Sequence, residues 1–156
     1  MKKLSILTCT MIALGFMATT GWAGPHFIKG PTANFDTTNG DLCISFKEAG
    51  LGSTPVTYTI TADNETFTFQ CFTKSNNTPQ GDPNSVTDSN VSVPTTLTPH
   101  NGQISASLCL LPDQDGASCQ GHGLVLKLIA ASYTNVQFCD SGTGGCVSLG
   151  SFSFGP

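Results

Sequence analysis

The sequence predicts an all-β fold, and three observations support that prediction. Apolar and polar residues alternate along most apolar segments, as they do in strands with one buried face. Thr, Val, Phe and Ile dominate these segments, and all four favour strands. Turn-forming residues separate the segments, and no helical apolar stripe of useful length occurs. We expect about seven to nine short antiparallel strands in a single disulfide-stapled β-sandwich, immunoglobulin-like or jelly-roll-like.

Residues 1–23 are expected to be a secretory signal peptide. Two lysines near the start provide the positive region, and the apolar stretch after them is too short for a good membrane span. Small residues at Gly21 and Ala23 suit a cleavage site. We therefore expect the mature chain, residues 24–156, to be secreted or periplasmic and to have no stable membrane span.

Composition excludes one broad class of function. The chain contains six lysines and no arginine, and its net charge is −4. Removal of the two lysines at positions 2 and 3 changes the charge of the mature chain to −6. Because nucleic-acid binding relies on clustered Lys and Arg, no nucleic-acid partner is expected.

The domain is expected to begin with an extension, residues 24–40, and to continue as a core, residues 41–156. The first core strand has Leu42, Ile44 and Phe46 on one face.

Residues 55–73 are expected to form a β-hairpin. Alternating apolar residues precede and follow Asp63-Asn64, a pair that is typical of tight turns. The polar segment 74–90, which contains proline and glycine, is expected to be the longest loop.

Asn101-Gly102 predicts a second hairpin turn, between a strand that contains Val91 and Val93 and a return strand, residues 104–110. A second irregular loop is expected at residues 112–123.

A long central strand is expected from Leu124 to Phe138, because the even-numbered positions provide one nearly continuous apolar face. A bend is expected near Ala130-Ala131. A helix over residues 124–131 is the alternative, but the flanking glycines and the continued alternation favour the strand. One or two closing strands are expected around Val147, Leu149, Phe152 and Phe154.

The mature chain has six cysteines, an even number that predicts a disulfide framework in an exported protein. Fifteen connectivities are open to them. Cys139 and Cys146 flank a glycine-rich segment and are expected to clip a hairpin across its open end. No short Cys-x-x-Cys pair suggests zinc. The six cysteines are Cys43, Cys71, Cys109, Cys119, Cys139 and Cys146.

Two acidic segments are weak candidates for calcium. Each supplies only two carboxylates, whereas calcium takes six or more oxygen ligands, so solvated loop acids are the expected interpretation and no metal is expected. The residues concerned are Asp113, Asp115, Asp82 and Asp88.

Several stretches resemble an uncharacterised family of small secreted bacterial β-rich proteins. The SFKEAGLG segment is the most specific of them. The resemblance covers most of the mature chain and implies fold and export, but no activity. The matching stretches are GPHF at 24–27, SFKEAGLG at 45–52, NGQI at 101–104 and YTNV at 133–136, with the two shared cysteines Cys71 and Cys119.

The same resemblance implies a disulfide scheme, because only the positions of Cys71 and Cys119 recur in that family. A fully local scheme, 43–71 and 109–119, is the alternative. The implied bridges are Cys71–Cys119, Cys139–Cys146 and Cys43–Cys109.

We expect a non-enzymatic domain that binds or assembles at the cell exterior without a cofactor. A surface glycan, a protein or a second copy of the chain would be its partner. One alternative is a self-assembling subunit in which residues 24–35 add a strand to a neighbour. Another is a small metal-dependent or hydrolytic enzyme, and its candidate residues are Asp82, Asp88, His100 and His122.

Overall fold

The computed structural model describes residues 24–114 and 116–155. These residues form seven strands and no helix, so the expected all-β class is confirmed for them. The expected signal peptide lies outside the described residues. The strands are β1 (His26–Phe35), β2 (Leu42–Ala49), β3 (Val56–Thr73), β4 (Pro79–Leu97), β5 (Gln103–Leu110), β6 (Leu124–Asp140) and β7 (Gly145–Phe154).

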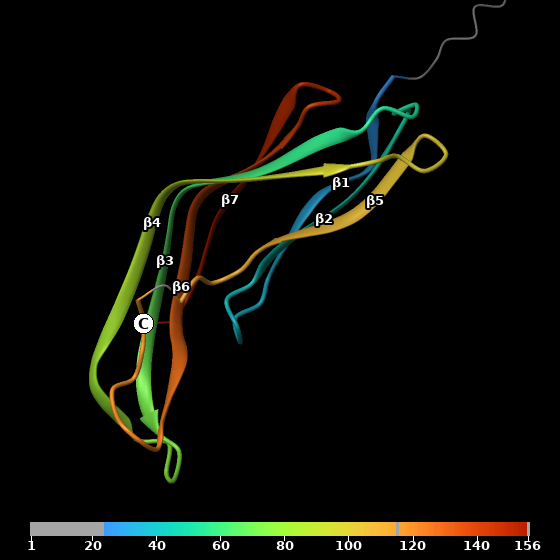
Figure 1. Cartoon of the computed structure of the whole chain (residues 1–156). Helices are drawn as coiled ribbons and strands as arrows, with labels where there is room; N and C mark the ends of the chain where they lie inside the picture. Colours follow the sequence, from blue (N-terminus) through green and yellow to red (C-terminus); the bar gives the residue numbers. More distant parts are fainter. Residues whose placement is uncertain (1–23, 115, 156) are drawn as a thin grey trace, which may run out of the picture.

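The strands form two antiparallel sheets, one with the order β1-β2-β5 and one with the order β4-β3-β6-β7. The second sheet is much longer, because β3, β4 and β6 have 18, 19 and 17 residues. Figure 1 shows the three-stranded sheet next to only one half of the four-stranded sheet. The other half extends beyond it, and β3 and β4 are longer than the short strands that were expected.

The core lies between the two sheets and is rich in aromatic rings. In β2 every second residue from Leu42 is buried, as the alternation predicted. Phe46 of β2 contacts Tyr58 of β3 and Phe138 of β6, with ring centroids 4.4 and 4.8 Å apart. Close contacts between tilted aromatic rings add to the stabilisation that burial provides.

The amino-terminal segment is part of this core rather than an appendage. Residues 26–35, which lie in the expected extension, pair with β2 as strand β1. The Phe27 ring lies 6.2 Å from that of Phe46, and the Phe35 ring lies 5.9 Å from that of Tyr133. The alternation in this segment is weak because the exposed Lys29 interrupts its inward series, whose other members are only half-buried.

The expected hairpin at residues 55–73 was wrong, because these residues form the single strand β3. Asp63 and Asn64 are exposed but cause no reversal: Asn64 pairs with Ser89 of β4 and with Thr134 of β6. The buried positions change from even to odd numbers here, since Ala62 and Glu65 both point inward. The turn-forming pair therefore marks a shift in the alternation.

The expected long loop at residues 74–90 was also wrong over most of its length, because β4 begins at Pro79. Strand β4 lies at the edge of its sheet and is mostly exposed, so it lacks the apolar alternation that identifies inner strands. Prolines and acids such as Asp82 are typical of edge strands, where they discourage pairing with other chains.

Strand β6 confirms the long strand expected from residue 124 and excludes the helical alternative. Its inner face is not purely even-numbered, however. Its pairing with β3 shifts by one residue between Leu128 and Ala130, near the expected bend, and its buried positions then become odd. They return to even numbers at Val136. Tyr133, which is not part of the expected even-numbered face, is therefore fully buried.

Asn101-Gly102 forms the predicted turn, with both residues at positive φ. The turn does not join two strands of one sheet, because β4 and β5 belong to different sheets. A single bridge between His100 and Gln103 closes it.

Candidate functional site

The residues that the sequence offered for catalysis or metal binding do not come together. Asp82 and Asp88 lie on β4, and His100 lies in the turn that follows it. A straight strand of this length would span about 60 Å. His122 lies in the connection before β6, next to Gly123, whose carbonyl accepts a hydrogen bond from Lys74 near the start of β4. The two histidines are thus at opposite ends of β4.

No metal-binding cluster replaces them. Within residues 24–114 and 116–155, no three His, Cys, Asp or Glu side chains are grouped as metal ligands. Asp113 lies in the connection after β5, and Asp115 lies outside the described residues. The part of the chain that the structure describes also encloses no pocket.

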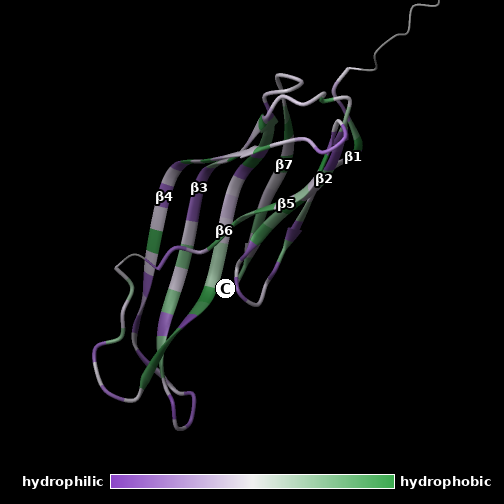
Figure 2. Cartoon of the chain, turned by 45° about the vertical axis from the view of Figure 1, so that its right-hand side comes forward, coloured by the Kyte–Doolittle hydropathy of each residue, from purple (hydrophilic) through white to green (hydrophobic). Residues whose placement is uncertain are grey.

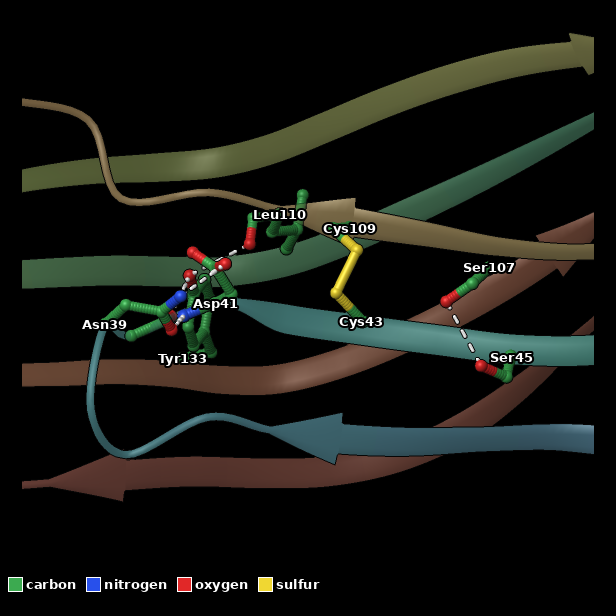
Figure 3. Close-up of a disulfide and its surroundings, with 9 residues drawn as sticks. Asn39, Asp41, Cys43, Ser45, Ser107, Cys109, Leu110 and Tyr133 are labelled. Carbon is green, nitrogen blue, oxygen red and sulfur yellow. Dashed lines mark hydrogen bonds between the residues drawn. A yellow bond between two sulfur atoms is a disulfide. The ribbon is translucent and has the colours of Figure 1, made fainter.

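Three disulfides join Cys43 to Cys109, Cys71 to Cys119 and Cys139 to Cys146, the pairs that the resemblance implied. The first links directly opposite residues of β2 and β5 (Figure 3), and the third links opposite residues of β6 and β7. The second joins β3 to the connection before β6. Three bridges within one chain indicate an oxidising environment.

The connection before β6, of which the structure describes residues 111–114 and 116–123, lies over the half of the long sheet that the small sheet leaves open (Figure 1). Ala117 packs against the core, and Cys119 is bonded to Cys71 at the far end of β3. Phe67 and Phe69 are at most 1% exposed, so this half of the inner face is well covered.

Tyr133 of β6 links the long sheet to the turn before β2 and to the end of β5. Its hydroxyl donates a hydrogen bond to the Gly40 carbonyl at 2.9 Å, and the Leu110 carbonyl lies 3.5 Å away (Figure 3). Gly40 has φ +81°, and a Cβ atom there would lie 2.6 Å from Leu128 Cδ2. Only glycine fits this close approach between the 36–41 turn and the long sheet.

A buried acidic cluster lies where the ends of β2 and β6 meet the start of β3. Glu48 is 0% exposed and Asp140 is 3% exposed. The Tyr58 hydroxyl donates to Glu48 Oε2 at 2.6 Å. Burial raises the pKa of Glu48, and the nearby Asp140 carboxylate raises it further, while the Tyr58 hydrogen bond opposes both effects. Burial and the Glu48 carboxyl also raise the pKa of Tyr58.

A second buried acid, Glu65, lies on the inner face of β3, opposite Asp88 of β4 and Tyr133 of β6. Its exposure is 9%. Burial raises its pKa to about 6, with smaller contributions from the negative charges of Asp88 and Asp113. Burial likewise raises the pKa of Tyr133.

The outer face of the four-stranded sheet is covered with hydroxyl side chains, and we call it the hydroxyl face. Thr57–Thr96, Thr66–Thr87 and Thr68–Ser85 hydroxyl oxygens lie 2.8, 3.1 and 2.9 Å apart. Figure 2 shows hydrophilic and hydrophobic residues alternating along these strands, as expected for a sheet with one buried face. The face contains Thr57, Thr59, Thr61, Thr66 and Thr68 of β3, Ser85, Thr87, Ser92 and Thr96 of β4, Ser132 and Thr134 of β6, and Ser148 and Ser153 of β7.

Neither the buried acids nor the hydroxyl face was expected from the sequence. A signal for Glu48 was present, because it continues the inward series of Leu42, Ile44 and Phe46 with the same period of two. Asp140 had the same kind of signal, because it continues the even-numbered inward series of Val136 and Phe138. Glu65 had none, since it follows the point where the alternation of β3 shifts. For the hydroxyl face the signal lies in the threonines at 57, 59 and 61, which alternate with the buried Val56, Tyr58 and Ile60.

No helix in the described ranges has the length and the apolar character needed to cross a membrane. Comparisons of the chain with protein families, with curated proteins and with solved structures find no match.

Proposed function

We propose that the chain is an exported bacterial β-sandwich domain that binds a partner at the cell exterior and performs no catalysis. Its hydroxyl face is the contact surface, and a polysaccharide of the cell surface is the partner class that this chemistry suits best. Residues 1–23 act as the signal peptide, and residues 24–156 are the secreted or periplasmic protein. We also propose that the chain is a member of the family of small secreted bacterial β-rich proteins that it resembles.

The strand order supports the immunoglobulin-like kind of sandwich over the jelly roll. Seven strands divide into the groups 1-2-5 and 4-3-6-7. An immunoglobulin constant domain divides its seven strands into 1-2-5-4 and 3-6-7, so the only difference is the sheet to which the fourth strand belongs. A jelly roll has eight strands.

The hydroxyl face is the observation that supports binding. It extends across all four strands of the long sheet, and neighbouring hydroxyls are held in pairs across β3 and β4. Hydroxyls fixed in this way still have free donor and acceptor capacity, so they can exchange hydrogen bonds with a polyhydroxylated partner. An uncharged partner is favoured, because Thr and Ser dominate the face.

Co-sedimentation with insoluble polysaccharides tests the proposal. Isolated peptidoglycan, chitin and cellulose are the probes. We expect the purified protein to sediment with at least one of them, and Thr66→Arg, which places a long charged side chain at the centre of the face, to lower the bound fraction at least tenfold.

Ser45→Arg is the matched control, because Ser45 makes the same kind of hydroxyl pair, with Ser107 at 3.1 Å, on the outer face of the other sheet (Figure 3). It should bind like the unmodified protein. Absence of binding to every polysaccharide, or equal loss in both variants, would contradict the proposed surface.

Self-assembly by strand addition is the second candidate, and one observation favours it. Strand β4 has 19 residues and no hydrogen-bonded neighbour on its outer side in the described chain. Residues 26–35 pair with β2 and pack Phe27 and Phe35 into the core, so their deletion would expose that core. Growth of particles with protein concentration, measured without polysaccharide, would support assembly instead.

A further inference from the structure

The acidic cluster of Glu48, Tyr58 and Asp140 contains a buried oxygen whose surroundings do not suit an ionised carboxylate. Oε1 of Glu48 is the one side-chain oxygen or nitrogen in the described residues that is fully buried and has no hydrogen-bond partner. A charged oxygen in this state would be strongly unfavourable, because it has lost its water and gained no partner. The Asp140 carboxyl lies within hydrogen-bonding reach of Glu48, but two carboxylates without a proton between them repel each other.

The surroundings of Asp140 identify which acid is ionised. Its Oδ1 accepts from the Gly142 backbone N–H at 2.6 Å. Its Oδ2 accepts from the backbone N–H and the hydroxyl of Thr143, at 3.1 and 2.8 Å. A carboxylate can accept about four hydrogen bonds, so one position remains open. Glu48 accepts a single hydrogen bond, from Tyr58.

We propose that Glu48 keeps its proton in the folded protein above pH 4.5, where a solvated glutamate ionises, and donates this Oε1 proton to the Asp140 carboxylate. The proton connects the end of β2 to the 140–145 turn that joins β6 to β7. When the pH rises, the proton passes to solvent, two negative charges face each other in a buried site, and this connection opens. The cluster therefore makes the link between the end of β2 and the 140–145 turn dependent on pH.

Three elements pack titratable groups against Glu48. They are Tyr58 of β3, Asp140 of β6 and His26 of β1, whose ring is exposed and whose effect is the smallest. A positive charge on His26 would favour ionised Glu48, but burial and Asp140 act in the opposite direction. The contribution of Glu48 to stability is complete below pH 4.5, the ordinary value of its pKa, and is lost as the pH rises through the raised value.

The composition of the chain allows a direct test by NMR. Glu48 and Glu65 are its only glutamates. In the Glu65→Gln variant, glutamate labelled with ¹³C at the side-chain carboxyl therefore yields one signal, from Glu48. We expect this signal to remain at the protonated position at pH 4.5 and above, and to move only at markedly higher pH. A titration midpoint at or below 4.5 would overturn the proposal.

A second measurement tests the link between Glu48 and the 140–145 turn. Amide hydrogen exchange of Gly142 and Thr143 reports whether the Asp140 carboxylate still holds the turn. In the unmodified protein their protection should fall as Glu48 ionises. In Glu48→Gln, where an amide replaces the protonated acid and donates to Asp140, protection should be independent of pH over the same range.

Tyr58→Phe is the control, because it removes the hydrogen bond to Oε2 and leaves Oε1 unchanged. It should raise the Glu48 titration midpoint, since the Tyr58 hydroxyl favours the ionised acid. A midpoint that falls in Tyr58→Phe, or protection that depends on pH equally in Glu48→Gln, would show that the proton does not connect these residues.

Discussion

Glu65 shows how a single acid on the inner face can limit stability at neutral pH. It is 9% exposed, and its pKa is raised to about 6, mainly by burial. A carboxyl with a raised pKa contributes its full stability below pH 4.5 and loses it as the pH rises through about 6. Above that range, the folded chain holds a poorly solvated negative charge.

We therefore expect Glu65→Gln to be more stable than the unmodified protein by about 1–2 kcal/mol above pH 6, and nearly equal to it at pH 4.5. Urea unfolding at both pH values measures the difference. Asp63→Asn, an exposed acid on the same strand, is the control and should show no gain. A loss of stability in Glu65→Gln above pH 6 would contradict this account.

At the level of elements, the alternation of inward and outward residues shifts near the middle of the long sheet. Asn90 of β4 and Asn135 of β6 both have positive φ, at 56° and 51°. Between them on β3, Asp63 accepts a hydrogen bond from Asn135 Nδ2 at 2.6 Å, and Asn64 accepts one from the Ser89 hydroxyl at 2.9 Å. Figure 1 shows that these strands bend along their length. We attribute the bend to this row of polar residues.

Asn135→Val should lower the free energy of unfolding by about 2–3 kcal/mol, because a β-branched residue is strained at positive φ and cannot donate to Asp63. Asn135→Gly loses only the hydrogen bond and should cost less than half as much. Chemical denaturation measures both. Equal costs would show that the left-handed backbone at this position carries no strain.

At the level of the whole molecule, the disulfides restrict the unfolded chain unequally. They close segments with sequence separations of 66, 48 and 7 residues. Loop-closure entropy predicts that Cys71–Cys119 contributes about 4 kcal/mol and Cys139–Cys146 about 2 kcal/mol.

We expect Cys71→Ala with Cys119→Ala to lower the melting temperature more than Cys139→Ala with Cys146→Ala. The first variant also frees the segment around Cys119 from the long sheet, where Cys71 now holds it. Calorimetry of the two double variants, with intact mass to confirm the remaining bridges, makes the comparison. A larger loss in the second variant would contradict the entropic argument.

Local patterns were sufficient for the strands that bury one face throughout. Leu42 to Glu48 alternates without a break, so β2 and its inward residues follow from the sequence. The edge strand β4 was missed because its residues meet the core weakly, and the chemistry of an edge strand resembles that of a loop. The burial of Tyr133 was missed because it depends on a register shift between two strands.

The sequence by itself therefore determined the all-β class, the first inward residues of β2, the long strand β6, and an even set of cysteines outside the amino-terminal segment. These properties depend on the period of neighbouring residues and on composition. The tertiary structure alone decided that β3 continues through Asp63-Asn64, and that β4 and β5 belong to different sheets. It also decided that Glu48 meets Asp140. Each of these depends on which distant segments pair and in what register, because a shift of one residue turns every following side chain to the opposite face.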